Sequence, residues 1–364
     1  MLVMVKCWCK RLHKEAYRMK ITQTAFGKAN QHEVTKYTVT NDHGVKMSVL
    51  NFGGIWQEYS VPTDHGQLNL LLAANSMEDY LDAGYSICQL IGPVANRIGK
   101  ASFQIDNHEY QLQANEGANS IHSGDQGWQN HFWHVQTATS ASAGQIILSN
   151  HYSPEDDGMP ANTDVHIVYT LHDDDSVTID MYGESDAPTL FNPTNHAYWN
   201  LADAGVDTIE GQELTINSRY HLAVNGEKIP TGALVENLGS AYDFKDGQML
   251  GHALNEMLKT PEKGFDDFFV VKPSTTFAQE PIAKLRDPKS GRELQMYSDR
   301  NALVIFSANG LPASVKLNRP GKSWAALALE AQALPDAPHH PEFGDITLRP
   351  LAPVHHQIRY AIKF

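Results

Sequence analysis

The chain is poor in cysteine and in long apolar runs, and each shortage excludes a class of protein. Its 364 residues include three cysteines, Cys7, Cys9 and Cys88. An odd number cannot all pair within one chain, so a disulfide framework is not indicated and reduced thiols in the cytoplasm are expected. Lys6 interrupts the apolar start of the chain, which disfavours a secretory signal. No later stretch approaches the roughly 20 apolar residues that span a bilayer.

Basic residues are also scarce, with 28 Lys and Arg against 42 Asp and Glu and a net charge of −14. Phosphate groups and anionic lipids would be repelled by this balance, so nucleic acid and membranes are not expected partners. The hydrophobic content of 41% is that of an ordinary globular protein. A neutral small molecule is the partner that suits this composition best.

The first twenty residues differ from the rest of the chain. Met1–Arg18 has a mixed, basic composition without a clear hydrophobic period. Met19 and the residues after it resemble the natural start of a protein chain. We therefore expect residues 1–20 to be an extension outside the fold, and residues 21–364 to form one domain. An appended amphipathic helix is the alternative for the extension.

From Val34 onward the sequence alternates between short strand patterns and turns. Asn41–Gly44, Asp106–His108, His172–Asp175 and Asp287–Gly291 carry strong turn signals. The strands expected are Val34–Thr40, Val45–Phe52, Ser102–Ile105, Tyr110–Gln113, Trp133–Thr139, Gln145–Asn150, Val165–Leu171, Val177–Tyr182, Leu285–Arg286, Glu293–Tyr297, Ala302–Ser307, Trp324–Leu329 and Ile358–Phe364.

Helical patterns are few, at Ser76–Leu81, which opens with a Ser-x-x-Asp capping pattern, and at Met249–Leu258. Strands joined by turns, without alternating helices, indicate antiparallel sheets rather than a βαβ fold. No fixed-period repeat is present, which disfavours a propeller or solenoid. The expected fold is all-β, a single large antiparallel β-sandwich with a few short helices.

Two segments place polar residues inside uncharged stretches. In Ile91–Gly99, Arg97 is flanked by apolar residues and glycines, a costly setting for a charge unless it has a partner. An arginine that pairs with a surface carboxylate is the alternative. In Asn119–Gly124, His122 lies among turn formers and reads as a loop residue, the kind of position that often carries binding groups.

Two further segments suggest a polar site on strands. Phe191–Asn200 is uncharged yet holds His196 beside asparagines and aromatics, which suits sugar hydroxyls and C–H faces. A well hydrogen-bonded structural histidine is the alternative. Glu330 ends a long run of core-type residues and shares a face with Gln332 if the chain is extended. Partial burial would raise the pKa of Glu330 and make it a better base, and a salt-bridged structural glutamate is the alternative.

Other chemistries lack their motifs. There is no Walker-type phosphate loop, His-Glu-x-x-His or Gly-x-Ser-x-Gly. The pairs His339-His340 and His355-His356 could suggest a metal. Adjacent strand residues point to opposite faces, however, so each pair supplies at most one ligand, and no metal is expected.

Together these segments resemble the galactose mutarotase (aldose 1-epimerase) family. The resemblance extends from about Ile21 to Phe364, with the motifs in the family's order. The motifs are a Gly-x-x-Ala-Asn-Arg-Ile segment from Gly92, Asn-Ser-x-His-x-Gly at Asn119–Gly124, Asn192–Leu201, the aromatic-flanked Asp243, and the ending Leu329–Pro350.

The resemblance implies a mutarotase-type β-sandwich without a cofactor, which interconverts the α and β anomers of a free aldose such as galactose or glucose. It implies that Glu330 is the base, that His196 is the acid on the ring oxygen, and that His122 orients that end of the ring. Asn96, Arg97 and Asp243 would hold sugar hydroxyls, with Gln332 a weaker candidate. A monomer or homodimer is expected.

The sequence departs from the family pattern at Pro93, where many relatives have Arg, and at Asp267, which replaces a His. Both departures can change which sugar fits, and the loss of a basic group disfavours a sugar phosphate. Three alternatives remain: a sugar-binding protein without turnover, a maltose-preferring epimerase, and a glycoside hydrolase using Glu330 with Asp243.

Overall fold

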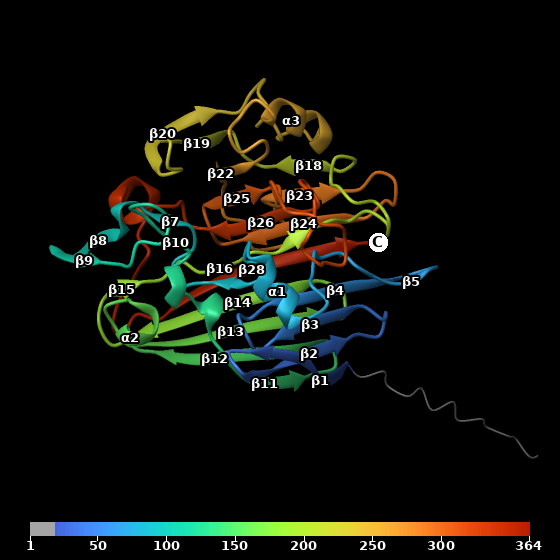
Figure 1. Cartoon of the computed structure of the whole chain (residues 1–364), viewed down its shortest axis with the longest axis horizontal. Helices are drawn as coiled ribbons and strands as arrows, with labels where there is room; N and C mark the ends of the chain where they lie inside the picture. Colours follow the sequence, from blue (N-terminus) through green and yellow to red (C-terminus); the bar gives the residue numbers. More distant parts are fainter. Residues whose placement is uncertain (1–18) are drawn as a thin grey trace, which may run out of the picture.

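Antiparallel strands dominate the computed structural model, which describes residues 19–364 (Figure 1). The expected all-β antiparallel fold is therefore confirmed. The expectation for Met1–Arg18 lies outside the described residues and stays a prediction. No helix in the described range is long and apolar enough to cross a membrane.

Two sheets contain most of the strands drawn in blue and green in Figure 1, and they lie side by side. The five-stranded sheet runs, in spatial order, β1 (Lys20–Ala29), β2 (His32–Thr40), β3 (Lys46–Leu50), β4 (Trp56–Thr63), β5 (Gly66–Asn69). The nine-stranded sheet runs β11 (His134–Thr139), β12 (Ala143–Tyr152), β13 (Thr163–His172), β14 (Val177–Ser185), β28 (Val354–Lys363), β24 (Glu293–Ser298), β23 (Ala283–Arg286), β18 (Glu213–Ile216), β21 (Gln248–Met249).

A third sheet, of six strands, carries the residues of greatest interest. Its order is β17 (Tyr198–Trp199), β26 (Leu327–Gln332), β25 (Ala302–Phe306), β22 (Asp266–Val270), β19 (Tyr220–Val224), β20 (Pro230–Glu236). Short pairs complete the fold: β7 (Arg97–Ile98) with β10 (Ser120–Ile121), β6 (Leu90–Ile91) with β16 (Thr194–Asn195), β8 (Ser102–Ile105) with β9 (His108–Gln111), and β15 (Thr189–Leu190) with β27 (Thr347–Leu348).

Helices are short, as expected. They are α1 (Met77–Ala83), α2 (Pro154–Asp157) and α3 (Leu250–Met257), with 3-10 turns at Gly99–Ala101, Gly124–Gln126, Trp128–Asn130, Ala337–His339 and Pro341–Phe343. The Ser-x-x-Asp pattern works as predicted: the backbone N–H of Asp79 donates to the Ser76 hydroxyl at 3.1 Å and caps α1.

Alternation along the strands builds the core. In β13, Val165, Ile167 and Tyr169 are buried while the residues between them face outward. Buried side chains from all three large sheets join one hydrophobic core, in which Trp199 packs against Tyr360 from β28, while Phe268 and Val304 of the six-stranded sheet belong to a second, smaller cluster. Each such side chain contributes about 1.5–3 kcal/mol when fully buried.

Most expected strands are present with shifted ends. Strand β26 begins at Leu327 rather than Trp324 and extends through Gln332, so Glu330 lies inside it rather than after it. The first strand, β1, was not expected, because its residues alternate between polar and apolar side chains only weakly and most are exposed at a sheet edge.

Candidate active site

A cavity of about 310 Å³ opens where the six-stranded sheet meets the β7–β10 pair. Five of the predicted site residues line it: Asn96, Arg97, His122, His196 and Glu330. The remaining walls include Tyr85, Glu116, Tyr198, Asp266 and Phe306. Residues far apart in the sequence are therefore brought to one place by the sheets.

Glu330 occupies the middle of the buried strand β26, where it pairs with Val304 of β25. Only 1% of the residue is exposed. Burial raises the pKa of the Glu330 carboxyl well above its ordinary value, the charge of Asp266 raises it further, and Arg97 opposes the shift. Among the described residues its Oε2 has no hydrogen-bond partner. A buried carboxylate oxygen without a partner is available to a ligand.

His196 is held between β16 and β17 by its backbone, which donates to Gln89 and accepts from Cys88. Its ring stacks on Tyr198 with the ring centroids 4.8 Å apart. Burial lowers the pKa of His196 to about 4. Its Nε2 lies 3.4 Å from Oε1 of Glu330.

The protonation states of Glu330 and His196 are coupled, because the two side chains are in contact and almost completely buried. Burial disfavours the charged form of each group, raising one pKa and lowering the other. A single proton shared between them keeps the net charge at zero, either as an ion pair or as a neutral pair. The short contact stabilises the ion pair, whereas burial penalises it. These opposing effects bring the ion pair and the neutral pair closer in free energy.

His122 is fixed as a neutral hydrogen-bond donor. The backbone N–H of Asn96 donates to its Nδ1 at 3.1 Å, so the ring proton of neutral His122 sits on Nε2. Burial lowers the pKa of His122 well below its ordinary value, and the neighbouring His196 and Arg97 lower it further. The His122 and His196 ring centroids are 5.6 Å apart. The cavity thus holds two neighbouring imidazoles, and burial favours the neutral form of each.

Asn96 and Arg97 come from the turn that leads into β7. Asn96 has a φ of +62°, which asparagine adopts more readily than most residues, and its Oδ1 accepts from the Arg97 backbone. Arg97 donates to both carboxylate oxygens of Glu116, at 2.5 and 2.8 Å, and lies 3.9 Å from Asp266. Arg97 therefore pairs with a carboxylate, as the alternative interpretation expects, and it also lines the cavity.

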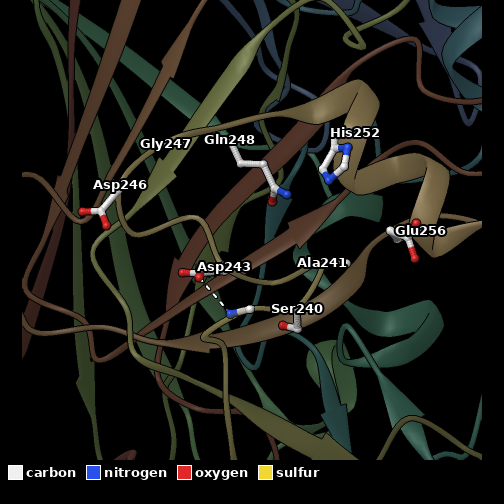
Figure 2. Close-up of a pocket in the computed structure, with 9 residues that line it drawn as sticks. Ser240, Ala241, Asp243, Asp246, Gly247, Gln248, His252 and Glu256 are labelled. Atoms are coloured by element: carbon white, nitrogen blue, oxygen red, sulfur yellow. Dashed lines mark hydrogen bonds between the residues drawn. The ribbon is translucent and has the colours of Figure 1, made fainter.

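The structure does not bring Asp243 into this cavity. Figure 2 shows it in a separate hollow with Asp246, Gln248 and His252, where its carboxylate accepts from the backbone N–H of Gly239 at 2.9 Å. The expected grouping of Asp243 with Asn96 and Arg97 is corrected. The flanking aromatics explain the outcome: the Tyr242 ring stacks at 4.0 Å on His221 and Phe244 is buried, which leaves Asp243 to close a turn.

Gln332 is also outside the cavity. It is completely buried in β26, and its Nε2 donates to the carbonyl of Ala333 at 3.3 Å. Sharing a strand face with Glu330 does not bring it to the site, because that face continues into the interior beyond the cavity.

Asp266 lines the cavity and was not among the predicted site residues. It begins β22, and its neighbour Asp267 points the other way, as successive strand residues do. Asp267 is buried, accepts from the Tyr242 hydroxyl at 3.3 Å, and its pKa is raised by burial to about 6. Neither Asp267 nor Pro93, the two departures from the family pattern, lines the cavity.

The histidine pairs contact carboxylates. His339 lies 2.6 Å from Asp336 and His340 lies 3.1 Å from Glu342. In the second pair, His355 and His356 contact Asp180 and Asp299 at 2.8 and 2.7 Å. Within residues 19–364 no group of three or more His, Cys, Asp or Glu is arranged to hold a metal ion.

An all-β sandwich with a buried carboxylate–imidazole pair in a small polar cavity is suited to acid–base chemistry on a small ligand. The sequence model described as Aldose 1-epimerase matches residues 35–361. The maltose epimerase of Levilactobacillus brevis is 37% identical, covering 94% of this chain and 98% of that protein. The aldose 1-epimerase of Streptococcus thermophilus is 36% identical, covering 95% and 98%.

Solved structures agree. The galactose 1-epimerase from Lactobacillus acidophilus superposes with a TM-score of 0.82 at 25% identity, covering 95% of this chain and 99% of that one. The chain belongs to the aldose 1-epimerase family and is a carbohydrate isomerase acting on free sugars.

Proposed function

We propose that the cavity converts one anomer of a free aldose into the other, with Glu330 as the base and His196 as the acid. The observation that carries this proposal is the 3.4 Å contact between His196 Nε2 and Glu330 Oε1. The hydroxyl and the ring oxygen that exchange protons in this reaction are both bonded to C1. An acid and a base that serve two oxygens on one carbon must each lie within hydrogen-bond reach of its oxygen, and two groups in contact can satisfy this requirement.

The proton transfers balance within the pair. The Glu330 carboxylate removes the proton of the C1 hydroxyl, the His196 imidazolium protonates the ring oxygen, and the C1–O5 bond breaks to give the aldehyde. After rotation about C1–C2, O5 attacks the other face of C1 while His196 takes its proton and Glu330 returns one to the carbonyl oxygen. The pair keeps one proton throughout, which suits a site where burial disfavours net charge.

The other cavity residues would bind and orient the ring. His122, with its proton on Nε2, donates to the ring-oxygen end. Arg97 and Asp266 face the same space and offer a donor and an acceptor to hydroxyls. Asn96 positions His122 and Arg97 through its backbone and side chain.

The alternatives predict different results. A glycoside hydrolase needs two carboxyl groups about 5–9.5 Å apart across a glycosidic bond. Asp243, the expected partner of Glu330 in that alternative, lines another hollow. A sugar-binding protein without turnover would have no need for the Glu330–His196 contact.

Polarimetry on freshly dissolved α-D-glucose, α-D-galactose and maltose tests the proposal. We expect the rotation to reach equilibrium at a rate proportional to enzyme concentration, without release of free glucose from maltose. Sugar binding without faster mutarotation would favour the binding protein, and glucose release would favour the hydrolase.

The similarity to a maltose epimerase supports maltose as a second candidate substrate. The acidic composition with three cysteines supports a location in the cytoplasm and a neutral sugar. Activity as a monomer or homodimer, and a single domain from residue 21 to 364, remain part of the proposal.

A further inference from the structure

A second hollow, of about 280 Å³, adjoins the catalytic cavity, and we name it the outer hollow. Its lining includes Gly117, Asn119, Gly226, Glu227 and Lys228. The loop between β19 and β20 supplies the last three, and the segment before β10 supplies the first two.

The outer hollow lies next to the catalytic cavity. Arg97 and Glu116 line both spaces. Lys228 on the outer side also reaches the catalytic side, where its Nζ donates to the backbone carbonyl of Asp266 at 3.4 Å. A ligand larger than one ring could therefore extend over the Arg97–Glu116 pair from one space into the other.

The charges of the outer hollow fit a neutral, hydroxyl-rich group. Arg97 is already paired with Glu116, and Lys228 lies 3.1 Å from Glu262. The exposed Glu227 accepts one bond, at 3.3 Å from the Asn119 amide, and retains acceptor capacity for hydroxyls. Because neither cation is left without a carboxylate, a phosphate group would find no net positive charge there.

Two glycines keep this space open. A Cβ added at Gly117 or at Gly226 would meet no atom within 4 Å, so both border free volume. Gly226 is the second residue of the turn closed by the Lys228 N–H and the Asn225 carbonyl at 3.1 Å, and its φ is not positive. The backbone there does not require glycine, whereas a second sugar ring in the hollow would require the absence of a side chain.

We infer that the outer hollow binds the non-reducing ring of a disaccharide whose reducing ring occupies the catalytic cavity. This inference rests on the proposed function, because mutarotation requires C1 of the reducing ring to be free. A 4-linked disaccharide such as maltose satisfies that requirement, since C4 lies across the pyranose ring from C1. The second ring adds contacts beyond the reacting end, and these raise kcat/KM when they hold the reducing ring in its reactive position.

Maltose and glucose, compared in the wild type and in Gly226→Trp, test the inference. We expect the wild type to have a kcat/KM for maltose about tenfold above that for glucose. Gly226→Trp fills the outer hollow, so kcat/KM for maltose should fall about tenfold while that for glucose stays within about twofold. The matched control is Gly211→Trp, since Gly211 also has a non-positive φ and open space around its Cβ but lines neither hollow.

Equal effects of Gly226→Trp on both sugars, or no effect, would overturn the inference, as would a wild type that prefers glucose. If the melting temperature shows that Gly226→Trp does not fold, Glu227→Ala replaces it, with an expected loss of about threefold for maltose alone. If the wild type turns over neither sugar, the proposed function fails on its own. Calorimetric titration then decides the outer hollow: maltose must bind more tightly than glucose, and Gly226→Trp must abolish the difference.

Discussion

Two carboxylates of this chain, Glu330 and Asp243, are both expected at the sugar site from the sequence, yet the structure places them in different hollows. Glu330 lies in the middle of a fully buried strand and reaches the cavity beside His196. Asp243 stands between two aromatics in a turn and accepts from the Gly239 backbone in another hollow. The difference teaches that a long uncharged run predicts burial of the carboxylate itself, whereas aromatic neighbours can pack inward and leave the carboxylate outside.

The largest effect that sharpens this comparison is expected from Glu330→Gln. Glutamine keeps the shape of the side chain but cannot accept the proton, so kcat should fall by about 10²–10⁴ while sugar still binds. Asp243→Asn is the matched control and should leave kcat and KM within about twofold, because it lines a different hollow. Polarimetric initial rates measure both. Equal losses in the two variants would place Asp243 in the catalytic machinery and break the comparison.

His196→Asn should reduce kcat by a factor similar to that of Glu330→Gln, about 10²–10⁴. The double variant should be less than multiplicatively slower, since the two groups exchange one proton and neither is effective alone. A fully multiplicative loss in single-turnover or steady-state kcat would contradict the concerted use of the pair.

The sequence predicts candidate site residues where a polar residue lies in an uncharged or apolar stretch, because such a stretch indicates that a reactive group is buried. His196 and Glu330 lie within uncharged stretches, and Arg97 stands between apolar residues, so the sequence alone predicts all three as residues of one site, and the structure places them in one cavity. Asp266 is not among the predicted site residues, because Asp266 and Asp267 share the same apolar neighbours in the sequence and only the placement of β22 separates the two side chains.

Other features depend on long-range packing that no local pattern contains. Glu116 stands near the end of a turn-rich segment, and its bond to Arg97 forms only when the β7–β10 pair is assembled. Gln332 lies on the same strand face as Glu330, as the alternation predicts. The depth of the cavity nevertheless decides which residue of that face can contact a ligand. Strand alternation therefore predicts the direction in which a side chain points, whereas only the structure shows how far that side chain lies from the surface.

Asp266→Asn should change the pH profile as well as the rate. The proposed mechanism needs one proton on the Glu330–His196 pair. Activity should therefore fall at low pH, where His196, with a pKa of about 4, becomes protonated while Glu330 still carries its proton. It falls at high pH when Glu330 loses the last proton. Burial is the largest cause of the raised pKa of Glu330, and the charge of Asp266 is the next. Removing that charge lowers the pKa of Glu330 and moves the alkaline limb of kcat/KM to lower pH.

The acid limb should stay in place in Asp266→Asn, because burial rather than Asp266 lowers the pKa of His196. Loss of a hydroxyl acceptor should also lower kcat/KM by about tenfold. Asp267→Asn is the control, since Asp267 faces Tyr242 and does not line the cavity. An alkaline limb that moves equally in both variants, or upward in Asp266→Asn, would refute the assignment of that limb to Glu330.

The smallest effect is expected from Asp243→Ala, and it concerns stability. The Asp243 carboxylate accepts the Gly239 N–H at 2.9 Å within a turn that also holds Ser240. Alanine leaves that N–H to water, so the free energy of unfolding should fall by about 1 kcal/mol. Chemical denaturation measures the loss, and Asp246→Ala in the same hollow is the control, because Asp246 is exposed and lies outside this turn bond. A loss of mutarotase activity at unchanged stability would show instead that the turn carboxylate and the buried one serve the same sugar.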